Sequence, residues 1–83
     1  MEANNEEGNK ITIILIDHQQ LFREGVKRVL ESESSFNILV SSDDYSVVNT
    51  LLSVQHVDVI LMDVNTLIEN KGSIREDIIN NTD

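Results

Sequence analysis

The sequence contains no cysteine, no proline and no tryptophan among its 83 residues. Without cysteine there are no disulfides or thiolate metal sites, and the separation of His18 from His56 disfavours a structural zinc site. Any metal ion would therefore need hard oxygen ligands. The sequence also lacks an apolar run of 18 residues and a basic, apolar leader, so it predicts neither a transmembrane helix nor a secretory signal. A cytoplasmic location is expected by default.

Basic residues are also scarce. Six Lys and Arg stand against 15 Asp and Glu, which gives a formal net charge of −9. This charge repels a phosphate backbone, so we expect no direct binding to nucleic acid. It could steer a basic protein partner, although acidic surfaces often serve solubility alone.

What is present suffices for one small domain. Residues 1–10 are polar and have almost nothing to bury, so they predict a disordered tail, and the domain is expected at residues 11–83. A chain this short buries only about 60 to 65% of the surface that its unfolded form exposes. We therefore expect its stability to be low.

Short β-branched runs alternate with segments of helical periodicity. The "SIRE" segment has the pattern of a capping box, Ser73 with Glu76, and predicts the start of the last helix. Strands are expected at residues 11–16, 36–41 and 57–62, and helices at 19–31, after a cap at Asp43 or Asp44, and from Ser73 onward. This alternation predicts a parallel sheet with right-handed crossovers.

Two aspartates follow predicted strands: Asp17 ends the first and Asp63 ends the third. Ligand sites in open parallel sheets lie beyond the carboxyl ends of the strands, so the two carboxylates should converge if these strands are neighbours. A magnesium ion would suit such a pair, since it takes oxygen ligands and keeps several waters. The alternative is an ordinary solvated strand end.

The segments "IILIDHQQLFREGVKRVLE" and "VDVILMDVN" resemble the amino-terminal half of a receiver domain, the phosphoacceptor module of bacterial two-component response regulators. "LFREGVKR" is similar to the segment that follows the first strand in NarL-type regulators of bacilli. The resemblance covers about residues 11–65. It implies a truncated flavodoxin-like receiver fold: a three-stranded parallel sheet in the order 2-1-3 with helices on both faces. It also puts Asp63 at the phosphoacceptor position and Asp17 first in the metal-binding acidic pair.

The sequence departs from the family pattern at several positions. His18 replaces the second acidic residue of the pair, and its nitrogen suits magnesium poorly. Thr66 and Leu67 stand where the family usually has Met-Pro, and Gly72 comes one position late. The chain also lacks the later strands that supply a Ser or Thr and a Lys. We therefore expect an inactive phosphoacceptor position, at most weak Mg²⁺ binding by Asp17 and Asp63, and no other cofactor.

Three further polar features have ordinary explanations. His18 could be a metal ligand or a pH-sensitive group, but a histidine at the start of a helix usually caps it or forms a hydrogen bond. His56 precedes a strand in a loop and is expected to have no special role. Asp43 and Asp44 are interpreted as a helix cap with a favourable dipole position, with metal binding as the alternative.

Two surfaces are candidates for binding a partner. Arg23, Lys27 and Arg28 are expected on an exposed helix face, where a partner could dock, although a solvated face is the default. The third strand would lie at the sheet edge with its backbone unpaired on one side, and Ile60 and Met62 would be incompletely covered. This edge predicts a homodimer, or pairing with a strand of another protein.

The sequence thus favours a non-enzymatic interaction module that binds a response regulator, its kinase or another regulator and modulates it by mimicry. A degenerated gene or a mobile element such as a prophage could give rise to such a chain. The alternative is a working phosphoacceptor that is phosphorylated on Asp63 in two-component signalling. A nonfunctional fragment is the third possibility.

Overall fold

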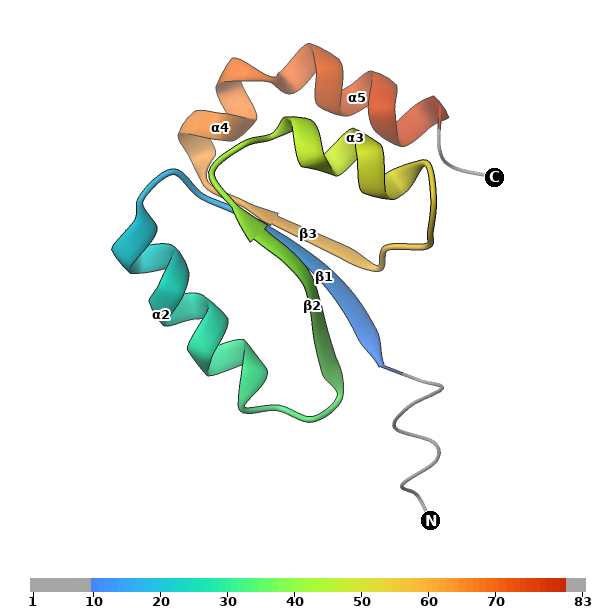
Figure 1. The fold of residues 1–83 in the computed structure, drawn as a ribbon. Helices are drawn as coiled ribbons and strands as arrows, with labels where there is room; N and C mark the ends of the chain where they lie inside the picture. The colour runs from blue at the N-terminus through green and yellow to red at the C-terminus, as the bar shows by residue number, and fades with distance from the viewer. Residues whose placement is uncertain (1–9, 81–83) are drawn as a thin grey trace.

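The computed structural model describes residues 10–80 (Figure 1). Apart from Lys10, the tail expected at residues 1–10 lies outside the described residues, as do the last three residues of the domain expected at 11–83. Within the described part of the chain, no helix has the length and apolar character that crossing a membrane requires.

A three-stranded parallel sheet forms the centre of the fold, and its order β2-β1-β3 confirms the predicted architecture. The strands are β1 (Ile11–Ile16), β2 (Phe36–Ser42) and β3 (Val59–Met62). The central strand is covered on both faces, because Ile13 to Ile16 are all buried. This explains its uninterrupted β-branched and aliphatic sequence, which is typical of a parallel sheet with helices on both sides.

Helices cover the two faces of the sheet in separate layers (Figure 1). On one face lies α2 (Gln20–Glu31); on the other lie α3 (Ser46–Leu52), α4 (Val64–Glu69) and α5 (Lys71–Asn80). The core is on the α3 side, where Ile14, Ile16 and Val48 are almost fully buried. Ile60 and Met62 pack against this core, together with residues of β2 and α3.

The segment after β3 differs from the sequence prediction. The predicted loop contains the helix α4, and α5 begins at Lys71, so Ser73 and Glu76 lie inside a helix and the predicted capping box is wrong. The chain passes from α4 to α5 at Asn70, whose carbonyl accepts the N–H of Ile74 and whose side chain donates to the Thr66 carbonyl. No helix N-terminus therefore exists at Ser73 that would need a cap.

The helix α5 packs against α3 through a polar contact. Tyr45 donates its hydroxyl to Asp77 at 2.7 Å, and burial together with this carboxylate raises the pKa of Tyr45. The predicted apolar side of this helix is only partly buried, since Ile74 is half-buried whereas Ile78 and Ile79 are exposed. Helical periodicity identified the apolar residues but not the neighbour that holds the helix.

The third strand begins at Val59 rather than at residue 57. Asp58 accepts hydrogen bonds from the Thr12 N–H at 2.8 Å and from the Thr12 hydroxyl at 3.1 Å. The Asp58 side chain thus occupies the N–H of Thr12 in β1, and regular pairing of β3 with β1 begins only after Asp58. His56, expected to have no special role, contacts the other oxygen of Asp58 at 2.7 Å.

Candidate functional site

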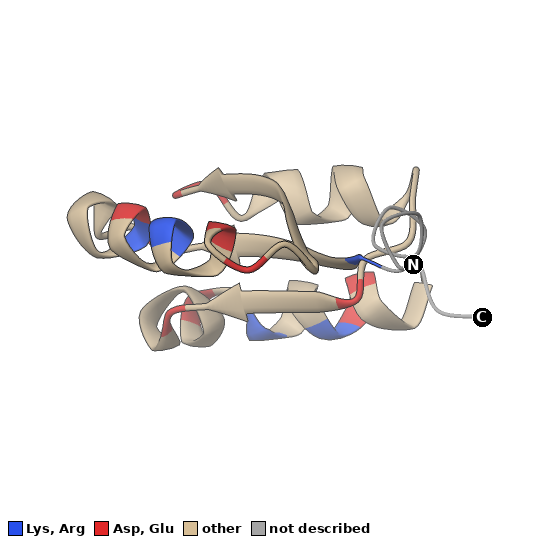
Figure 2. Cartoon of the chain, turned by 90° about the horizontal axis from the view of Figure 1, so that it is seen from below, with Lys and Arg blue, Asp and Glu red and all other residues tan. Residues whose placement is uncertain are grey.

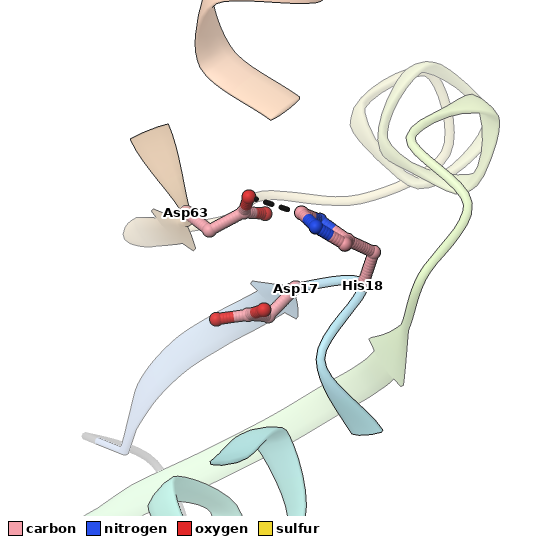
Figure 3. A group of neighbouring side chains, drawn as sticks. All are labelled: Asp17, His18 and Asp63. Atoms are coloured by element: carbon pink, nitrogen blue, oxygen red, sulfur yellow. Dashed lines mark ion pairs between the residues drawn. The ribbon is translucent and has the colours of Figure 1, made fainter. Parts of the chain in front are cut away.

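The carboxyl ends of β1 and β3 bring Asp17, His18 and Asp63 together (Figure 3). Ile16 pairs with Met62 in the parallel register, and the N–H of Asp63 donates to the carbonyl of Ile16 at 3.1 Å. One ligand atom from each of the three side chains lies within 4.8 Å of the others. The structure therefore brings together the two aspartates that the sequence predicted to converge, with His18 beside them.

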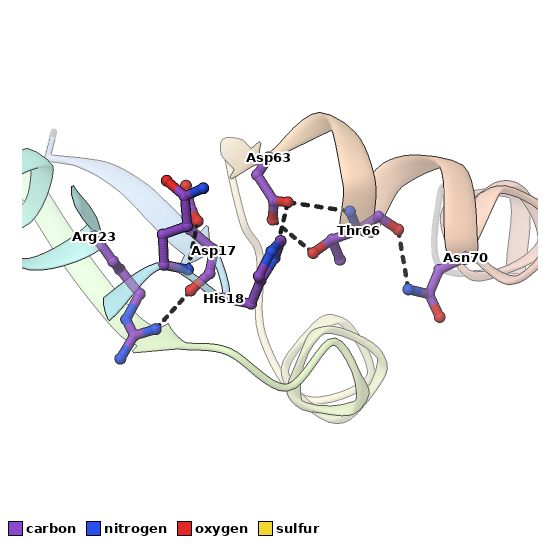
Figure 4. A network of polar contacts seen from close by, with 7 residues as sticks. Asp17, His18, Arg23, Asp63, Thr66 and Asn70 are labelled. Carbon is purple, nitrogen blue, oxygen red and sulfur yellow. Dashed lines mark hydrogen bonds and ion pairs between the residues drawn. The ribbon is translucent and has the colours of Figure 1, made fainter. Parts of the chain in front are cut away.

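Asp17 is a buried carboxylate, with only 5% of its surface exposed. One of its oxygens accepts the N–H of Gln19 at 2.9 Å. Arg23 does not reach the carboxylate: its guanidinium donates instead to the backbone carbonyl of Asp17 (Figure 4). Arg23 is half-buried by this contact, so it is not on the exposed face where the sequence analysis expected it.

Asp63 is the N-cap of α4. Its backbone is extended, and its two carboxylate oxygens accept the N–H of Thr66 at 3.2 Å and the hydroxyl of Thr66 at 2.5 Å (Figure 4). Such a cap satisfies donors that the first turn of a helix leaves without partners. Thr66 is itself buried, so this arrangement is protected from water. The sequence analysis noted Thr66 only as a departure from the family pattern; aspartate followed three residues later by threonine was the overlooked signal.

His18 supplies the third contact to Asp63. Its Nδ1 lies 3.1 Å from Oδ2 of Asp63, and half of the imidazole is exposed whereas Asp63 is mostly covered. Burial alone raises the pKa of Asp63, but the hydrogen bonds from Thr66 and the charge of His18 together lower it below its ordinary value. Asp63 is therefore ionised at neutral pH, with both oxygens engaged by residues of its own chain.

These residues do not fit the magnesium ion that the receiver resemblance implies. Mg²⁺ requires near-octahedral oxygen coordination and dehydrates reluctantly. Here His18 presents a nitrogen, and both oxygens of Asp63 already accept hydrogen bonds from Thr66. A magnesium ion would compete with these contacts and find a nitrogen in place of one of its oxygen ligands.

The α2 side of the sheet carries an apolar surface that sequence reasoning missed. α2 packs over β2 and β1, and Leu21, Phe22 and Val29 remain 88%, 59% and 69% exposed. Between α2 and β3 lies a hollow of about 440 Å³, whose lining includes Phe22, Val26 and Leu61. Periodicity showed that one face of this helix is apolar, but periodicity does not reveal how much of that face the sheet covers.

The most exposed apolar residues of β3 are two that the sequence analysis did not single out. Val59 and Leu61 are exposed on this strand, whereas Ile60 and Met62 pack against the core on the α3 side. Successive strand residues point to opposite faces, so the helices that cover Ile60 and Met62 leave the other pair open. Ile60 and Met62 are only partly buried, as the sequence analysis expected, but Val59 and Leu61 are the more exposed pair.

Asp44, Lys27 and Arg28 are not part of the cluster of Asp17, His18 and Asp63. Asp44 accepts the N–H of Ser46 at 3.0 Å, which lowers its pKa. The N-cap of α3 is Tyr45, however, so the cap predicted at Asp43 or Asp44 lies one residue too early. Lys27 is half-buried and Arg28 is exposed on α2. Both α2 and α5 carry basic as well as acidic residues (Figure 2).

Comparison with known proteins identifies a transcriptional regulator as a relative of this chain. The chain is 42% identical over 71 residues, 86% of its length, to the transcriptional regulatory protein DegU of Brevibacillus brevis. The chain spans about 30% of the length of that protein. No family model matches the chain, and no solved structure gives a significant match.

Proposed function

We propose, from the premise that this chain is a receiver-like domain related to the response regulators, that it acts as a non-enzymatic interaction module. It binds a response regulator, its kinase or another regulatory protein and modulates that partner by mimicry. Two findings support this proposal. The chain is 42% identical to a transcriptional regulatory protein, and its sheet has the order β2-β1-β3 that the receiver resemblance implies.

The observation that carries this proposal is the engagement of Asp63. Both oxygens of Asp63 accept hydrogen bonds from Thr66, and Oδ2 also contacts His18. These contacts fix the orientation of the carboxylate as a helix cap and withdraw electron density from the oxygens that would attack phosphorus. The side chain is therefore better suited to holding the local structure than to accepting a phosphoryl group.

The surface of α2 supports a binding role. Leu21, Phe22 and Val29 are exposed, and Arg28 with the half-buried Lys27 lies on the same helix. Interfaces commonly combine an apolar centre with a polar rim, and exposed apolar patches on small domains often mark interaction sites. The proposed contact surface is therefore α2 itself, referred to below as the α2 surface: Leu21, Phe22, Lys27, Arg28 and Val29.

Charge reversal on this helix tests the proposal. Purified response regulators and histidine kinases from the source organism would be titrated against the chain by biolayer interferometry. We expect the double variant Lys27→Glu, Arg28→Glu to weaken binding at least tenfold. The matched control Lys71→Glu, Arg75→Glu on α5 should change it less than twofold. Equal weakening by both variants would show that net charge, not the α2 surface, governs binding.

The second candidate function is phosphorylation on Asp63. The position of Asp63 at the end of β3, next to the buried Asp17, favours it. Incubation with acetyl phosphate and Mg²⁺ followed by intact-mass spectrometry tests it directly. A gain of one phosphoryl group in the native chain, absent in Asp63→Asn, would replace the interaction module with a phosphoacceptor.

A further inference from the structure

Gly25 lies in the middle of α2, and no contact within the described part of the chain requires a glycine there. A Cβ atom added at this position would meet nothing within 4 Å. Glycine weakens the interior of a helix relative to alanine, because it loses more backbone freedom on folding. One use of such a residue is to let another molecule come close to the backbone. Gly25 is therefore a candidate point of contact for a second helix.

The neighbours of Gly25 along the outer side of α2 form an apolar ridge. Leu21 and Val29, which stand one helical turn before and after Gly25, are 88% and 69% exposed. Surface hollows of about 630 Å³ and 500 Å³ lie beside this ridge, and Leu21 and Gly25 line both of them. Helices pack on one another by placing such ridges of residues four apart into the grooves of a neighbour. This side of α2 thus has the shape of a helix-packing surface.

The two flanks of the ridge differ in chemistry. One flank is apolar, with Phe22 59% exposed and Val26 half-buried. The other flank carries Glu24 and Arg28, both exposed. Within residues 10–80, no ion pair or side-chain hydrogen bond engages Glu24 or Arg28. The two opposite charges are therefore available to a second molecule.

The same helix in a second, antiparallel copy complements this pattern. Glu24 precedes Gly25 by one residue and Arg28 follows it by three. If two helices cross at Gly25, a rise of about 1.5 Å per residue puts Glu24 of one copy about 3 Å along the axis from Arg28 of the other. Leu21 and Val29 are equally far from Gly25, so each meets the other across the contact. A two-fold axis also places the charged flanks side by side and the apolar flanks side by side.

We propose that α2 binds the α2 of a second copy of this chain, with the two helices antiparallel and in closest contact at Gly25. Glu24 of each copy pairs with Arg28 of the other, and Leu21 packs against Val29. The net charge of −9 opposes self-association, so these local contacts provide the affinity. The contact occupies part of the α2 surface and therefore competes with the protein partner proposed above. It does not depend on that partner, so either proposal can fail without the other.

The first test changes the point of closest contact in the full chain. Sedimentation equilibrium over a range of micromolar concentrations measures the dissociation constant of the dimer. Gly25→Gln should weaken the dimer at least tenfold, because the added side chain keeps the helices apart. The matched control Gly72→Gln, at a glycine of α5 that also has open space around it, should change the constant less than twofold. As monomers, Gly25→Gln should resist urea at least as well as the native chain, since glutamine favours a helix more than glycine does.

The second test exchanges the two charges. Glu24→Arg and Arg28→Glu should each weaken the dimer at least fivefold, because like charges then meet across the contact. The double variant Glu24→Arg, Arg28→Glu should return the dissociation constant to within twofold of the native value, since the pairs form again and the net charge is unchanged. Circular dichroism checks that each variant is folded.

Three results would each overturn the proposal. The first is a native chain that stays a folded monomer at these concentrations. The second is a dimer that Gly25→Gln does not weaken, which would assign self-association to the edge of β3 instead. The third is a double charge variant that dimerises no better than the two single variants.

Discussion

Asp63 has a structural role, whether or not it can accept a phosphoryl group. It caps α4 through Thr66 and contacts His18, so a position that the family resemblance associates with phosphorylation holds a helix in place. The sequence alone suggested an inactive phosphoacceptor because of His18, but it gave no reason for the residue to be retained. That reason depends on Thr66, whose N–H and hydroxyl both donate to Asp63 at the start of α4.

Two substitutions of Asp63 distinguish the stabilisation due to its helix cap from the stabilisation due to its negative charge. Asp63→Ala should lower the free energy of unfolding by about 1 kcal/mol, since it removes the cap, whereas Asp63→Asn should cost less than half as much because asparagine caps helices nearly as well. Urea unfolding followed by circular dichroism measures both. Equal losses in the two variants would mean that the negative charge, and not the cap, is what stabilises the fold.

Asp58 predicts a pH dependence. The Thr12 N–H, and then His56, hold the pKa of Asp58 below its ordinary value of 3.8. A carboxylate with a lowered pKa in the folded state stabilises the fold fully above that ordinary value and loses this contribution as the pH falls through the folded value. The native chain should therefore lose more stability than Asp58→Asn in this acid range. Unfolding curves at several pH values would contradict the assignment if the two chains lost stability in parallel.

At the scale of elements, local patterns predicted the three strands and the helices α2 and α3, because their apolar residues form short continuous runs in the strands and recur at helical spacing in the helices. The end of the chain was predicted poorly. The helix α4 depends on one side-chain cap, and α5 is held by the contact of Tyr45 with Asp77, a residue 32 positions away. No local periodicity encodes such a contact.

An apolar residue on the exposed side of α2 should contribute much less to the free energy of unfolding than an apolar residue of β1. Ile14→Ala removes a fully buried side chain and should cost about 2–5 kcal/mol. Val29→Ala removes an apolar side chain of which 69% is exposed, and it should change stability by less than about 0.5 kcal/mol. Urea unfolding compares the two. A large loss from Val29→Ala would show that α2 packs more closely than this structure describes.

At the scale of the whole molecule, β3 forms one edge of the sheet. Within residues 10–80, β3 pairs only with β1, and its exposed residues Val59 and Leu61 continue the apolar surface of α2. An edge strand of this kind is a template for another strand, because its N–H and C=O groups on one side lack partners. A domain this small gains much from additional burial, since a few hundred Å² at about 25 cal/mol per Å² amounts to several kcal/mol.

We therefore predict that the 83-residue chain self-associates, most simply as a two-fold dimer through β3 and the α2 surface. Sedimentation equilibrium at micromolar concentration should give a mass above the 9.4 kDa of the monomer. Leu61→Lys should restore the monomer without unfolding it, because Leu61 is exposed. A folded monomer of the native chain at these concentrations would sink this prediction.

The central claim, that Asp63 serves as a helix cap in a non-enzymatic module, is tested most directly by beryllofluoride, an analogue of the phosphoryl group. The amide NMR spectrum of the chain would be recorded before and after addition of beryllofluoride and Mg²⁺, with Asp63→Asn as the control. We predict that the signals of Asp17, Asp63 and Thr66 remain almost unchanged, because the Asp63 oxygens stay bonded to Thr66. Large shifts at these residues that Asp63→Asn abolishes would contradict the account and identify a working phosphoacceptor.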